Sequence, residues 1–415
     1  MAQSKLDVLV IGGGIVGAGV ARDAAMRGMR VALVERTDFA AGTSGKTSKL
    51  VHGGLRYLED FRLGLVRTAI RERDLWLRQE PRLVTPLEFV IPVYRGGDAG
   101  WKVRLALRAY AWLSRGAGRR ARMLSREGVA AEEPSLAPPG LRGGGKYMDA
   151  AVPDARFVWA VIAAATDAGA TVLNHAEVTG LVVESGRVVG ANVTDSLGGE
   201  KAPVRARIVV NAAGPWLDRV RALAVNSKPA LRPTKGIHIL VPRERIGNRH
   251  AAALRASDGR LVFVIPWGGF SLIGTTDTDY RGDPETVQAT DADVAYLLAA
   301  ANLAFPTARL TPADVVSTYA GVRPLVESGR PAQESDISRE HELLHDAGMM
   351  SIAGGKLTTY RAMAEEVVDA ITKHLGGNFR SCRTADVPLR PPPDPRAADE
   401  LRALVAKPEL IDRLL

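Results

Sequence analysis

The sequence predicts a mixed α/β protein (α+β overall), in which a Rossmann-type nucleotide-binding domain carries a second domain built on an antiparallel sheet. Three observations predict this fold class. An apolar strand runs into a glycine-rich turn and a helix near the N-terminus, and a second apolar strand ends in small residues at positions 211–214. Residues 231–280 then change to short strands separated by turns.

The N-terminal unit begins with an apolar, β-branched run at residues 6–11, which has the length of a buried strand. The next six residues, GGGIVG, fit G-x-G-x-x-G: Gly12 permits a tight turn, Gly14 lets the backbone approach a pyrophosphate, and Gly17 lets the next helix lie close to the strand. Residues 18–27 are that predicted helix, whose N-terminal N–H groups favour phosphate. The unit therefore predicts a dinucleotide site, with a ligand-free structural unit as the alternative.

An acidic residue closes the next strand. Residues 31–34 form the predicted second parallel strand, and Glu35 follows it, 23 residues after Gly12. A carboxylate at this position binds both ribose hydroxyls of an adenosine and repels a 2′-phosphate. The ligand is therefore expected to be FAD or NAD rather than NADP.

Length and composition limit the remaining possibilities. The 415 residues suggest two or three domains, and no apolar run reaches the roughly 18 residues that span a bilayer. The first strand begins too early to leave room for a signal peptide, so cytoplasmic synthesis is expected. The single cysteine, Cys382, excludes an internal disulfide and an all-cysteine iron–sulfur cluster. Electrons are therefore expected to reside on an organic cofactor and to leave to an external acceptor.

Much of the formal net charge of +9 lies in one window. Residues 95–126 carry nine Lys and Arg residues against one acid, Asp98, and the same window contains Trp101, Leu105 and Trp112. Mixed basic and apolar residues suit a helix that lies on an anionic membrane surface. A solvated basic face is the second interpretation, and a nucleic-acid surface is the least favoured.

Two other motifs resemble known sites. The run Gly45-Lys46-Thr47 is similar to the end of a P-loop, but no strand leads into it, so we interpret residues 40–50 as a loop that covers the pyrophosphate and the flavin ring. The run from His341 to His345 fits the zinc motif H-E-x-x-H, which requires a helix. Because Gly348 and a strand-like run follow, we expect a hairpin there and no metal.

The rest of the chain predicts further helices, strands and loops. We expect helices ending at 79, at 154–168, at 291–305 and at 356–374; strands at 87–93, 171–173, 178–183, 207–211 and 349–352; and loops at 132–134 and 138–145. From Pro391 the chain is expected to be a proline-rich linker with two short helical pieces.

Together, these stretches resemble the FAD-dependent glycerol-3-phosphate dehydrogenases, a branch of the D-amino-acid-oxidase-like flavoproteins. The resemblance extends from about residue 7 to 371. Its most specific piece is TSKLVHGGLRYLE at 47–59, and the further matches are 211–216, 263–267, 273–277, 321–325 and 354–361. It implies a Rossmann-type FAD-binding domain, an antiparallel-sheet substrate domain and a short helical C-terminal remnant. The family carries a longer helical C-terminal region, so that domain is expected to be absent or truncated here.

The resemblance implies oxidation of sn-glycerol 3-phosphate at C2 to dihydroxyacetone phosphate, with hydride passing to flavin N5 and electrons to a membrane quinone. A dianionic phosphate needs fixed positive charge, and the substrate-binding candidates are Arg56, Tyr57, Thr275, Arg323, Arg339 and Lys356. The catalytic candidates are His238, Arg323 and Lys356, with His238 as the acceptor of the C2 hydroxyl proton and a hydrogen-bonded core histidine as its alternative. The helix after Lys356 is expected to point at the flavin N1/O2 edge.

The FAD-binding candidates come from five stretches of the chain. They are Gly12, Gly14, Ile15, Val16, Gly17, Glu35, Arg36, Thr43, Ser44, Thr47, Ser48, Lys49, Leu50, Val178, Ala213, Gly214, Trp216, Gly355, Lys356, Leu357 and Thr358. The expected partners are sn-glycerol 3-phosphate, a membrane quinone and an anionic membrane surface, without nucleic acid. The expected location is cytoplasmic, peripheral on the inner face of the cell membrane, and a homodimer stays open.

The domain boundaries alternate along the chain. We expect FAD-binding segments at 1–85, 146–225 and 341–385, a substrate or cap segment with the basic helix at 86–145, the substrate-binding domain at 226–340, and the C-terminal remnant at 386–415. Two other functions stay open. One is an oxidase of the same fold that uses oxygen and a hydroxy or amino acid, and the other is a flavin-binding scaffold subunit.

Overall fold

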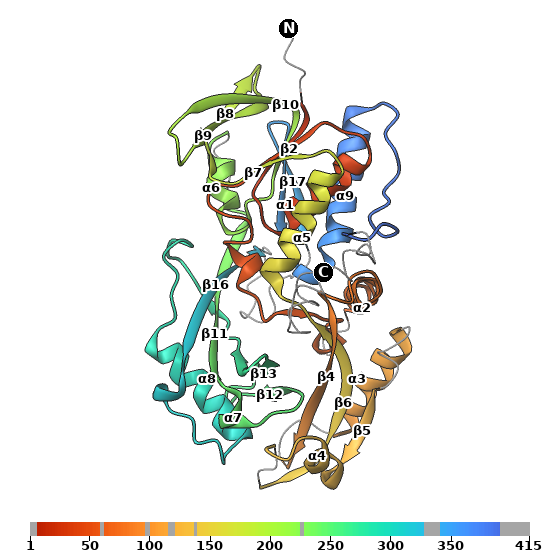
Figure 1. Ribbon diagram of the computed structural model, residues 1–415, viewed down its shortest axis with the longest axis vertical. Helices are drawn as coiled ribbons and strands as arrows, with labels where there is room; N and C mark the ends of the chain where they lie inside the picture. The colour runs from red at the N-terminus through yellow and green to blue at the C-terminus, as the bar shows by residue number, and fades with distance from the viewer. Residues whose placement is uncertain are drawn as a thin grey trace, which may run out of the picture.

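The computed structural model describes residues 6–58, 62–95, 100–114, 121–136, 139–224, 228–327 and 341–390. The chain forms two β-sheets, each with its own helices, and Figure 1 shows them one above the other along the long axis. The chain passes between the two sheets several times.

The first sheet has the predicted parallel core. Its order is β17-β18-β10-β1-β2-β7, and the pairs β18–β10, β10–β1, β1–β2 and β2–β7 are parallel. The strands are β1 (Leu6–Ile11), β2 (Val31–Val34), β7 (Thr171–Leu173), β8 (Ala176–Glu184), β9 (Arg187–Asp195), β10 (Lys201–Asn211), β17 (His341–Asp346) and β18 (Met349–Gly354). Strands β8, β9 and the start of β10 form an antiparallel extension, of which β9 has no counterpart in the sequence prediction.

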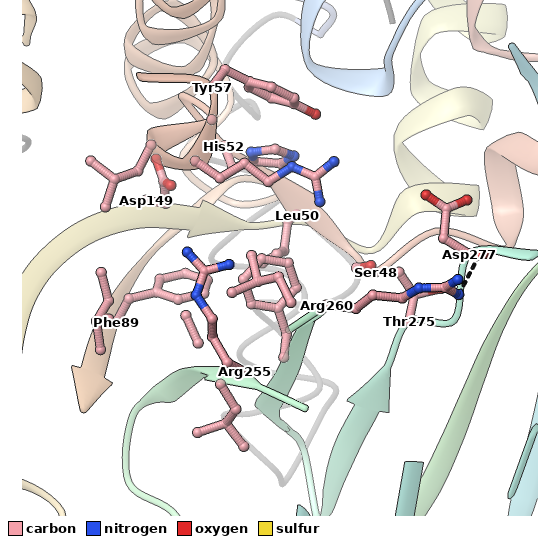
Figure 2. Close-up of a pocket in the computed structure, with 18 of the residues that line it drawn as sticks. Ser48, Leu50, His52, Tyr57, Phe89, Asp149, Arg255, Arg260, Thr275 and Asp277 are labelled. Atoms are coloured by element: carbon pink, nitrogen blue, oxygen red, sulfur yellow. Dashed lines mark hydrogen bonds between the residues drawn. The ribbon is translucent and has the colours of Figure 1, made fainter. Parts of the chain in front are cut away.

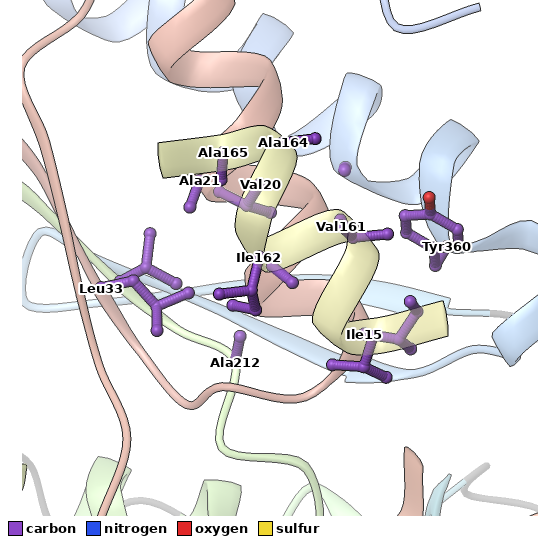
Figure 3. Close-up of a cluster of buried hydrophobic side chains, with 14 of the residues drawn as sticks. Ile15, Val20, Ala21, Leu33, Val161, Ile162, Ala164, Ala165, Ala212 and Tyr360 are labelled. Atoms are coloured by element: carbon purple, nitrogen blue, oxygen red, sulfur yellow. The ribbon is translucent and has the colours of Figure 1, made fainter. Parts of the chain in front are cut away.

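Three helices pack together on this sheet. They are α1 (Ile15–Met26), α5 (Asp154–Asp167) and α9 (Tyr360–Leu375). Figure 3 shows their contact, where Val20, Val161 and the Tyr360 ring meet above the strands, all buried. A Cβ on Gly19 of α1 would lie 2.8 Å from the Tyr360 ring, so the small residues of α1 and α5 permit this close approach. The predicted helix at 154–168 is confirmed.

The second sheet is larger and has both faces covered. Its order is β15-β11-β14-β13-β12-β4-β6-β3, with β16 on β11 and β5 on β6. The strands are β3 (Leu50–Val51), β4 (Thr85–Tyr94), β5 (Arg122–Ser125), β6 (Leu141–Ala151), β11 (Leu231–Pro242), β12 (Ala251–Arg255), β13 (Leu261–Trp267), β14 (Phe270–Gly274), β15 (Thr278–Asp279) and β16 (Ser317–Val326). All pairs are antiparallel except β4 with β12, which is parallel.

Alternating side chains divide the second sheet into two faces. Ala252 and Leu254 join a core with α8 (Asp291–Ala304), whereas Ala251 and Ala253 join a core with α3 (Gly100–Leu113). Figure 1 shows α8 and α3 on opposite sides of the strands. The other helices are α2 (Leu63–Gln79), α4 (Arg126–Glu132), α6 (Leu217–Ala222) and α7 (Arg243–Ile246).

The glycine-rich stretch before residue 146 corrects one prediction. Residues 138–145 were expected to be a loop, but Leu141–Ala151 is strand β6, so the expected boundary between 145 and 146 falls inside a strand. A Cβ on Gly145 would lie 2.7 Å from Leu107 of α3, and one on Gly144 would lie 2.9 Å from Val129 of α4. These glycines therefore let helices pack closely on a strand, where glycine is otherwise disfavoured.

The hairpin expected at the H-E-x-x-H run is confirmed. Strands β17 and β18 pair in antiparallel register, from His341 with Gly354 to Asp346 with Met349.

Among the residues that the structure describes, no group of three or more His, Cys, Asp or Glu side chains could hold a metal ion. In the same part of the chain, no helix is long and apolar enough to cross a membrane. The predicted linker after Pro391 lies outside the described residues.

Candidate functional site

The glycine-rich turn between β1 and α1 has the geometry that the motif predicts. Gly12 adopts φ +110°, and a Cβ on it would lie 2.6 Å from Ala212 O. A Cβ on Gly17 would collide with Gly12 O, so helix α1 lies directly against the turn. Gly14 is the N-cap of α1 and offers no side-chain cap. The cap position of α1 therefore carries no side chain that would block a phosphate at the helix N-terminus.

Glu35 lies beside this turn, at the end of β2. Its Oε2 accepts a hydrogen bond from Gly13 N at 2.7 Å, and its Oε1 accepts one from Thr37 N at 2.9 Å. Oε1 also accepts one from Thr37 Oγ1 at 3.3 Å. A carboxylate has about four acceptor positions, so Oε2 retains capacity for a ribose hydroxyl. Ile15 N donates to Ser44 Oγ at 3.0 Å, while Val16 packs partly buried against the first core.

The loop after the second strand is held mainly by Asp154. Thr47 donates to Asp154 Oδ2 through its N–H (3.0 Å) and its hydroxyl (2.8 Å), and Lys49 Nζ lies 2.7 Å from Asp154 Oδ1. Thr43 Oγ1 donates to Val322 O, and Leu50 is buried in β3. The polar groups of Thr47 and Lys49 are thus bound by the protein itself.

Two further backbone turns approach the same region. After β10, Asn211 Oδ1 accepts a hydrogen bond from Ala213 N, Gly214 adopts φ +54°, and the Trp216 ring lies 5.3 Å from the Arg36 guanidinium. Val178 of β8 packs partly buried in the core cluster that Ala213 also contacts.

After β18, Gly355 adopts φ +91° and a 3₁₀ turn, Leu357–Thr359, precedes α9. Thr358 Oγ1 accepts a hydrogen bond from His52 N at 3.1 Å. This contact joins the turn to the loop that contains Arg56 and Tyr57. The helix expected after Lys356 is therefore present, but it begins with a 3₁₀ turn.

Two of these loops, at 43–58 and at 355–358, line one large cleft of about 2070 Å³ that also reaches side chains of the second sheet. Figure 2 shows His52 and Tyr57 along one side of it and Arg255 and Phe89 along another. The cleft is lined both by the loop at 43–58 and by side chains of β11, β13 and β16. It therefore joins the predicted cofactor loop to the predicted substrate residues.

One wall of the cleft carries two cations around an aromatic ring. The 3₁₀ turn η2 (Leu55–Leu58) places Arg56 with its guanidinium 5.1 Å from the centre of the Tyr57 ring, and Lys356 Nζ lies 3.6 Å from the same ring. Both distances are within the range of a cation–π contact. Lys356 follows Arg56 by 300 residues in the sequence, yet the two cations share one subsite with Tyr57.

Arg323 of β16 faces the cleft from the second sheet, and its guanidinium is hydrogen-bonded to three neighbouring residues. Its Nη1 lies 3.0 Å from Asp277 Oδ1, and its Nη2 donates to Thr275 Oγ1 at 2.8 Å and to Thr276 O at 3.0 Å. A Cβ on Gly236 would lie 2.7 Å from Arg323 Cζ, so the glycine before Ile237 leaves room for the guanidinium. Asp277 is a residue that the sequence analysis missed as an orienting group, although it ends a matched motif.

His238 is buried in β11 beside Arg323. Its Nε2 is 2.8 Å from Ser48 Oγ, and its ring stacks on the Tyr319 ring at 4.8 Å. Burial, followed by the positive charges of Arg323 and Lys49, lowers the pKa of His238 to about 3. The imidazole is therefore neutral at pH 7. The contact with Ser48 was not predicted, because Ser48 was assigned to the cofactor.

Arg339 lies outside the described residues. Every other predicted site residue lies in the described part of the chain. Together the glycine turn, Glu35 and the α1 N-terminus fit an adenine dinucleotide, and the cleft lined by residues 43–58 and 355–358 fits the flavin ring. Ser44, Thr47 and Lys49 already hydrogen-bond within the protein, so these side chains fit less simply as cofactor contacts than the sequence suggested.

Helix α3 is amphipathic in the structure. Val103, Leu107 and Tyr110 are buried against the second sheet, whereas Trp101, Leu105 and Trp112 are 65%, 60% and 84% exposed. The exposed residues recur at helical spacing and Lys102, Arg104 and Arg108 lie among them. Residues 115–120 of the basic window lie outside the described residues.

Comparison with known proteins gives consistent matches. The family described as FAD dependent oxidoreductase matches residues 7–370. The aerobic glycerol-3-phosphate dehydrogenase of Staphylococcus haemolyticus is 40% identical over 403 residues, covering 94% of this chain and 72% of the relative. That of Staphylococcus aureus (strain MRSA252) is 40% identical over 399 residues, covering 92% and 71%.

Two solved structures are similar in fold. The glycerol-3-phosphate dehydrogenase of Bacillus halodurans complexed with FAD aligns with a TM-score of 0.81 at 36% identity, covering 100% of this chain and 75% of that one. The L-alpha-glycerophosphate oxidase of Mycoplasma pneumoniae with FAD bound aligns with a TM-score of 0.72 at 20% identity, covering 89% and 95%. The second likeness supports the fold alone.

Proposed function

The chain belongs to the family of FAD-dependent oxidoreductases, and from this premise we propose that its cleft oxidises sn-glycerol 3-phosphate at C2 to dihydroxyacetone phosphate. The activity is that of an FAD-dependent glycerol-3-phosphate dehydrogenase. The observation that carries the proposal is the single cleft that joins the loop at 43–58 to His238 and Arg323. It brings the loop that follows the dinucleotide-binding unit and a cationic substrate wall together.

The cations of the cleft suit the phosphate group. We assign the phosphate to Arg56 and Lys356, which both contact the Tyr57 ring, and to Arg323 on the facing sheet. A dianion gains most from fixed guanidinium groups, because they donate paired hydrogen bonds. Asp277 and Thr275 hold Arg323 in one orientation before the substrate binds.

His238 is proposed to accept the proton of the C2 hydroxyl. Because its pKa is near 3, the ring is neutral and one ring nitrogen carries a lone pair, but it is a weak base in the ligand-free protein. Part of this lowering comes from Arg323, whose charge a bound phosphate dianion would offset. Substrate binding is therefore expected to raise the basicity of His238 at the moment when a base is required.

When bound, FAD supplies the acceptor for the two electrons and the hydrogen that leave C2. The residues proposed to hold it are those of the turn at Gly12–Gly17, Glu35, and the turns at 213–216 and 355–358. The α9 N-terminus after Thr358 supplies a positive dipole end toward the cleft. These parts bind and orient, and the chemistry is left to the cofactor.

The electron acceptor and the location are a further part of the proposal. We propose that electrons pass to a membrane quinone and that α3 rests on the anionic inner face of the cell membrane. The three exposed apolar side chains of α3 and the basic residues between them support this, since such a face gains from both lipid burial and anionic headgroups. Trp101 and Leu105 also line the cleft, so the cleft opens beside this helix.

The substrate assignment is tested by anaerobic titration of the FAD-loaded protein. Adding sn-glycerol 3-phosphate should bleach the visible flavin absorption, whereas glycerol, which lacks the phosphate, should not. Arg323→Ala should abolish bleaching at substrate levels that saturate the wild type, while the control Arg205→Ala, which removes an exposed ion pair with Glu184, should not. A flavin that stays oxidised with substrate in the wild type would overturn the assignment, and hydrogen peroxide as the product in air would indicate an oxidase.

The membrane assignment is tested by sedimentation with vesicles that contain anionic lipid. Trp101→Glu with Trp112→Glu should reduce the bound fraction at least tenfold, because two apolar anchors are replaced by like charge. Leu197→Glu is the control, since Leu197 is 78% exposed but lies after β9 of the first sheet, away from α3 in the sequence. Equal binding by all three proteins would contradict a role for α3.

A further inference from the structure

We infer that Arg73, Tyr110 and Asp149 form a buried positioning network that holds the loop carrying Arg56 and Tyr57. We call these three residues the Asp149 network, and the loop is residues 52–58. None of the three side chains has a role in the mechanism above. The inference rests on the proposed function for its kinetic readout, but it also predicts a property of the loop that needs no substrate.

The centre of the network is one carboxylate oxygen. Asp149 Oδ1 accepts hydrogen bonds from Gly53 N at 2.9 Å, from Arg73 Nη1 at 2.8 Å and from the Tyr110 hydroxyl at 2.5 Å. The donors come from three separate elements: the loop, α2 and α3, while Asp149 belongs to β6. The network therefore ties the loop to two helices and a strand at one atom.

All members are removed from water. Arg73, Tyr110 and Asp149 are 1%, 0% and 2% exposed. Arg73 also bonds Asp74 Oδ1 at 2.7 Å and Met148 O at 3.2 Å, so its charge is compensated on several sides. Burial, and then the Asp149 carboxylate, raise the pKa of Tyr110 well above its ordinary value, so the phenol keeps its proton and stays a donor.

The loop backbone rests directly on this network. A Cβ on Gly53 would collide with the Tyr110 hydroxyl and would lie 2.6 Å from Ile70 Cγ1, so only glycine fits there. Gly54 then adopts φ +74°, and its carbonyl accepts the N–H of Tyr57 at 2.9 Å. Only two residues separate the anchored amide of Gly53 from Arg56, so a shift at Gly53 moves the phosphate-binding side chain.

Packing alone does not account for a buried charged group at this position. Burying an ion pair costs desolvation that attraction barely offsets, and apolar residues of similar volume often stabilise a fold as well or better. A buried carboxylate does, however, fix the position of the backbone amide whose hydrogen bond it accepts. Asp149 lies in the cleft wall beside the loop at 52–58, so a fixed position of the Gly53 amide there affects substrate binding.

The test uses FAD-loaded protein with Tyr110→Phe and Asp149→Asn. Tyr110→Phe keeps the ring and removes one donor, so the protein should fold with unchanged FAD content. The KM for sn-glycerol 3-phosphate should rise about tenfold with kcat within about twofold, because loss of a hydrogen bond to a charged group misplaces Arg56. Asp149→Asn, which keeps the acceptor and removes the charge, should raise KM further.

The matched control is Tyr296→Phe. Tyr296 also donates from a phenol to a carboxylate, Asp258 Oδ1 at 3.0 Å, but it lies on α8 on the other face of the sheet. Its KM should stay within twofold of the wild type. An equal rise in Tyr296→Phe and Tyr110→Phe would overturn the inference, as would an unchanged KM in folded Tyr110→Phe.

Amide hydrogen exchange provides the readout that needs no substrate. Exchange at residues 52–57 should be at least tenfold faster in Tyr110→Phe than in the wild type or Tyr296→Phe, while α9 exchanges alike in all three. Unchanged exchange in the loop would refute the positioning role. If the wild type is not reduced by the substrate, the proposed function fails on its own, and the exchange experiment still decides whether the network positions the loop.

Discussion

Replacing Gly12 by alanine should destabilise the protein through two separable effects. Gly12 adopts φ +110°, and an added Cβ would lie 2.6 Å from Ala212 O, which is backbone and cannot rotate away. The conformation costs an L side chain about 1–2 kcal/mol, and overpacking against fixed atoms costs about 1–3 kcal/mol more. The unfolding free energy should therefore fall by roughly 2–5 kcal/mol, and FAD should be lost.

Two other glycines separate the terms. Gly28 has φ +90° with nothing within 4 Å of the added Cβ, so Gly28→Ala should show the conformational cost alone, about 1–2 kcal/mol. Gly64, in the first turn of α2, has neither a positive φ nor a neighbour, so Gly64→Ala should stabilise by up to about 1 kcal/mol. Urea denaturation and the flavin-to-protein absorbance ratio measure both effects.

The predicted order is that Gly12→Ala loses stability and FAD, Gly28→Ala loses some stability and keeps FAD, and Gly64→Ala loses neither. A Gly12→Ala protein as stable and as fully loaded as Gly64→Ala would refute the reasoning about the turn. A Gly28→Ala protein that loses FAD would show that the measurement does not distinguish the site from the scaffold.

Three further outcomes are expected. Burial lowers the pKa of His238 to about 3, so below pH 6.5 the unfolded state binds more protons than the folded state. The free energy of unfolding should therefore fall by up to about 1.4 kcal/mol per pH unit from pH 6.5 toward pH 3. In urea denaturation at pH 5 and pH 7, His238→Asn should make this pH dependence smaller. Ser48→Ala should lower kcat about tenfold with FAD content unchanged, because His238 Nε2 loses its partner; unchanged stopped-flow reduction would exclude that role. Glu35→Ala should weaken FAD binding at least tenfold in fluorescence titration, because ribose acceptors and the bond to Gly13 N are lost; wild-type affinity would contradict the ribose assignment.

The local parts of the fold were predictable because their physics is local. The strand, the three glycines and Glu35 lie within 30 residues, and the structure places them as the motif requires. The hairpin at 341–354 was also predictable, since Gly348 interrupts any helix that could align the two histidines. Periodicity sufficed for α5, whose apolar residues repeat at helical spacing.

The missed parts depend on contacts between distant segments. The glycines of β6 resemble a loop until α3 and α4 are known to lie on them. Asp149 contacts Gly53 from 96 residues away, and Ser48 contacts His238 from 190 residues away. Likewise, Asp277 is an ordinary acid in sequence and becomes an orienting group only when β16 brings Arg323 beside it. One glycine was informative in retrospect. Gly274 pairs with His238, and a Cβ at position 274 would lie 2.8 Å from the imidazole Cγ, so the buried histidine requires a glycine opposite it.

The most direct test of the central claim is the rate of flavin reduction with isotopically labelled substrate, measured in a single anaerobic turnover. If C2 is oxidised in this cleft, sn-glycerol 3-phosphate with deuterium at C2 should bleach the flavin about two- to sevenfold more slowly than unlabelled substrate, while deuterium at C1 should leave the rate unchanged. Slowing by deuterium at C1 alone, or no bleaching with either substrate, would contradict C2 oxidation by this protein.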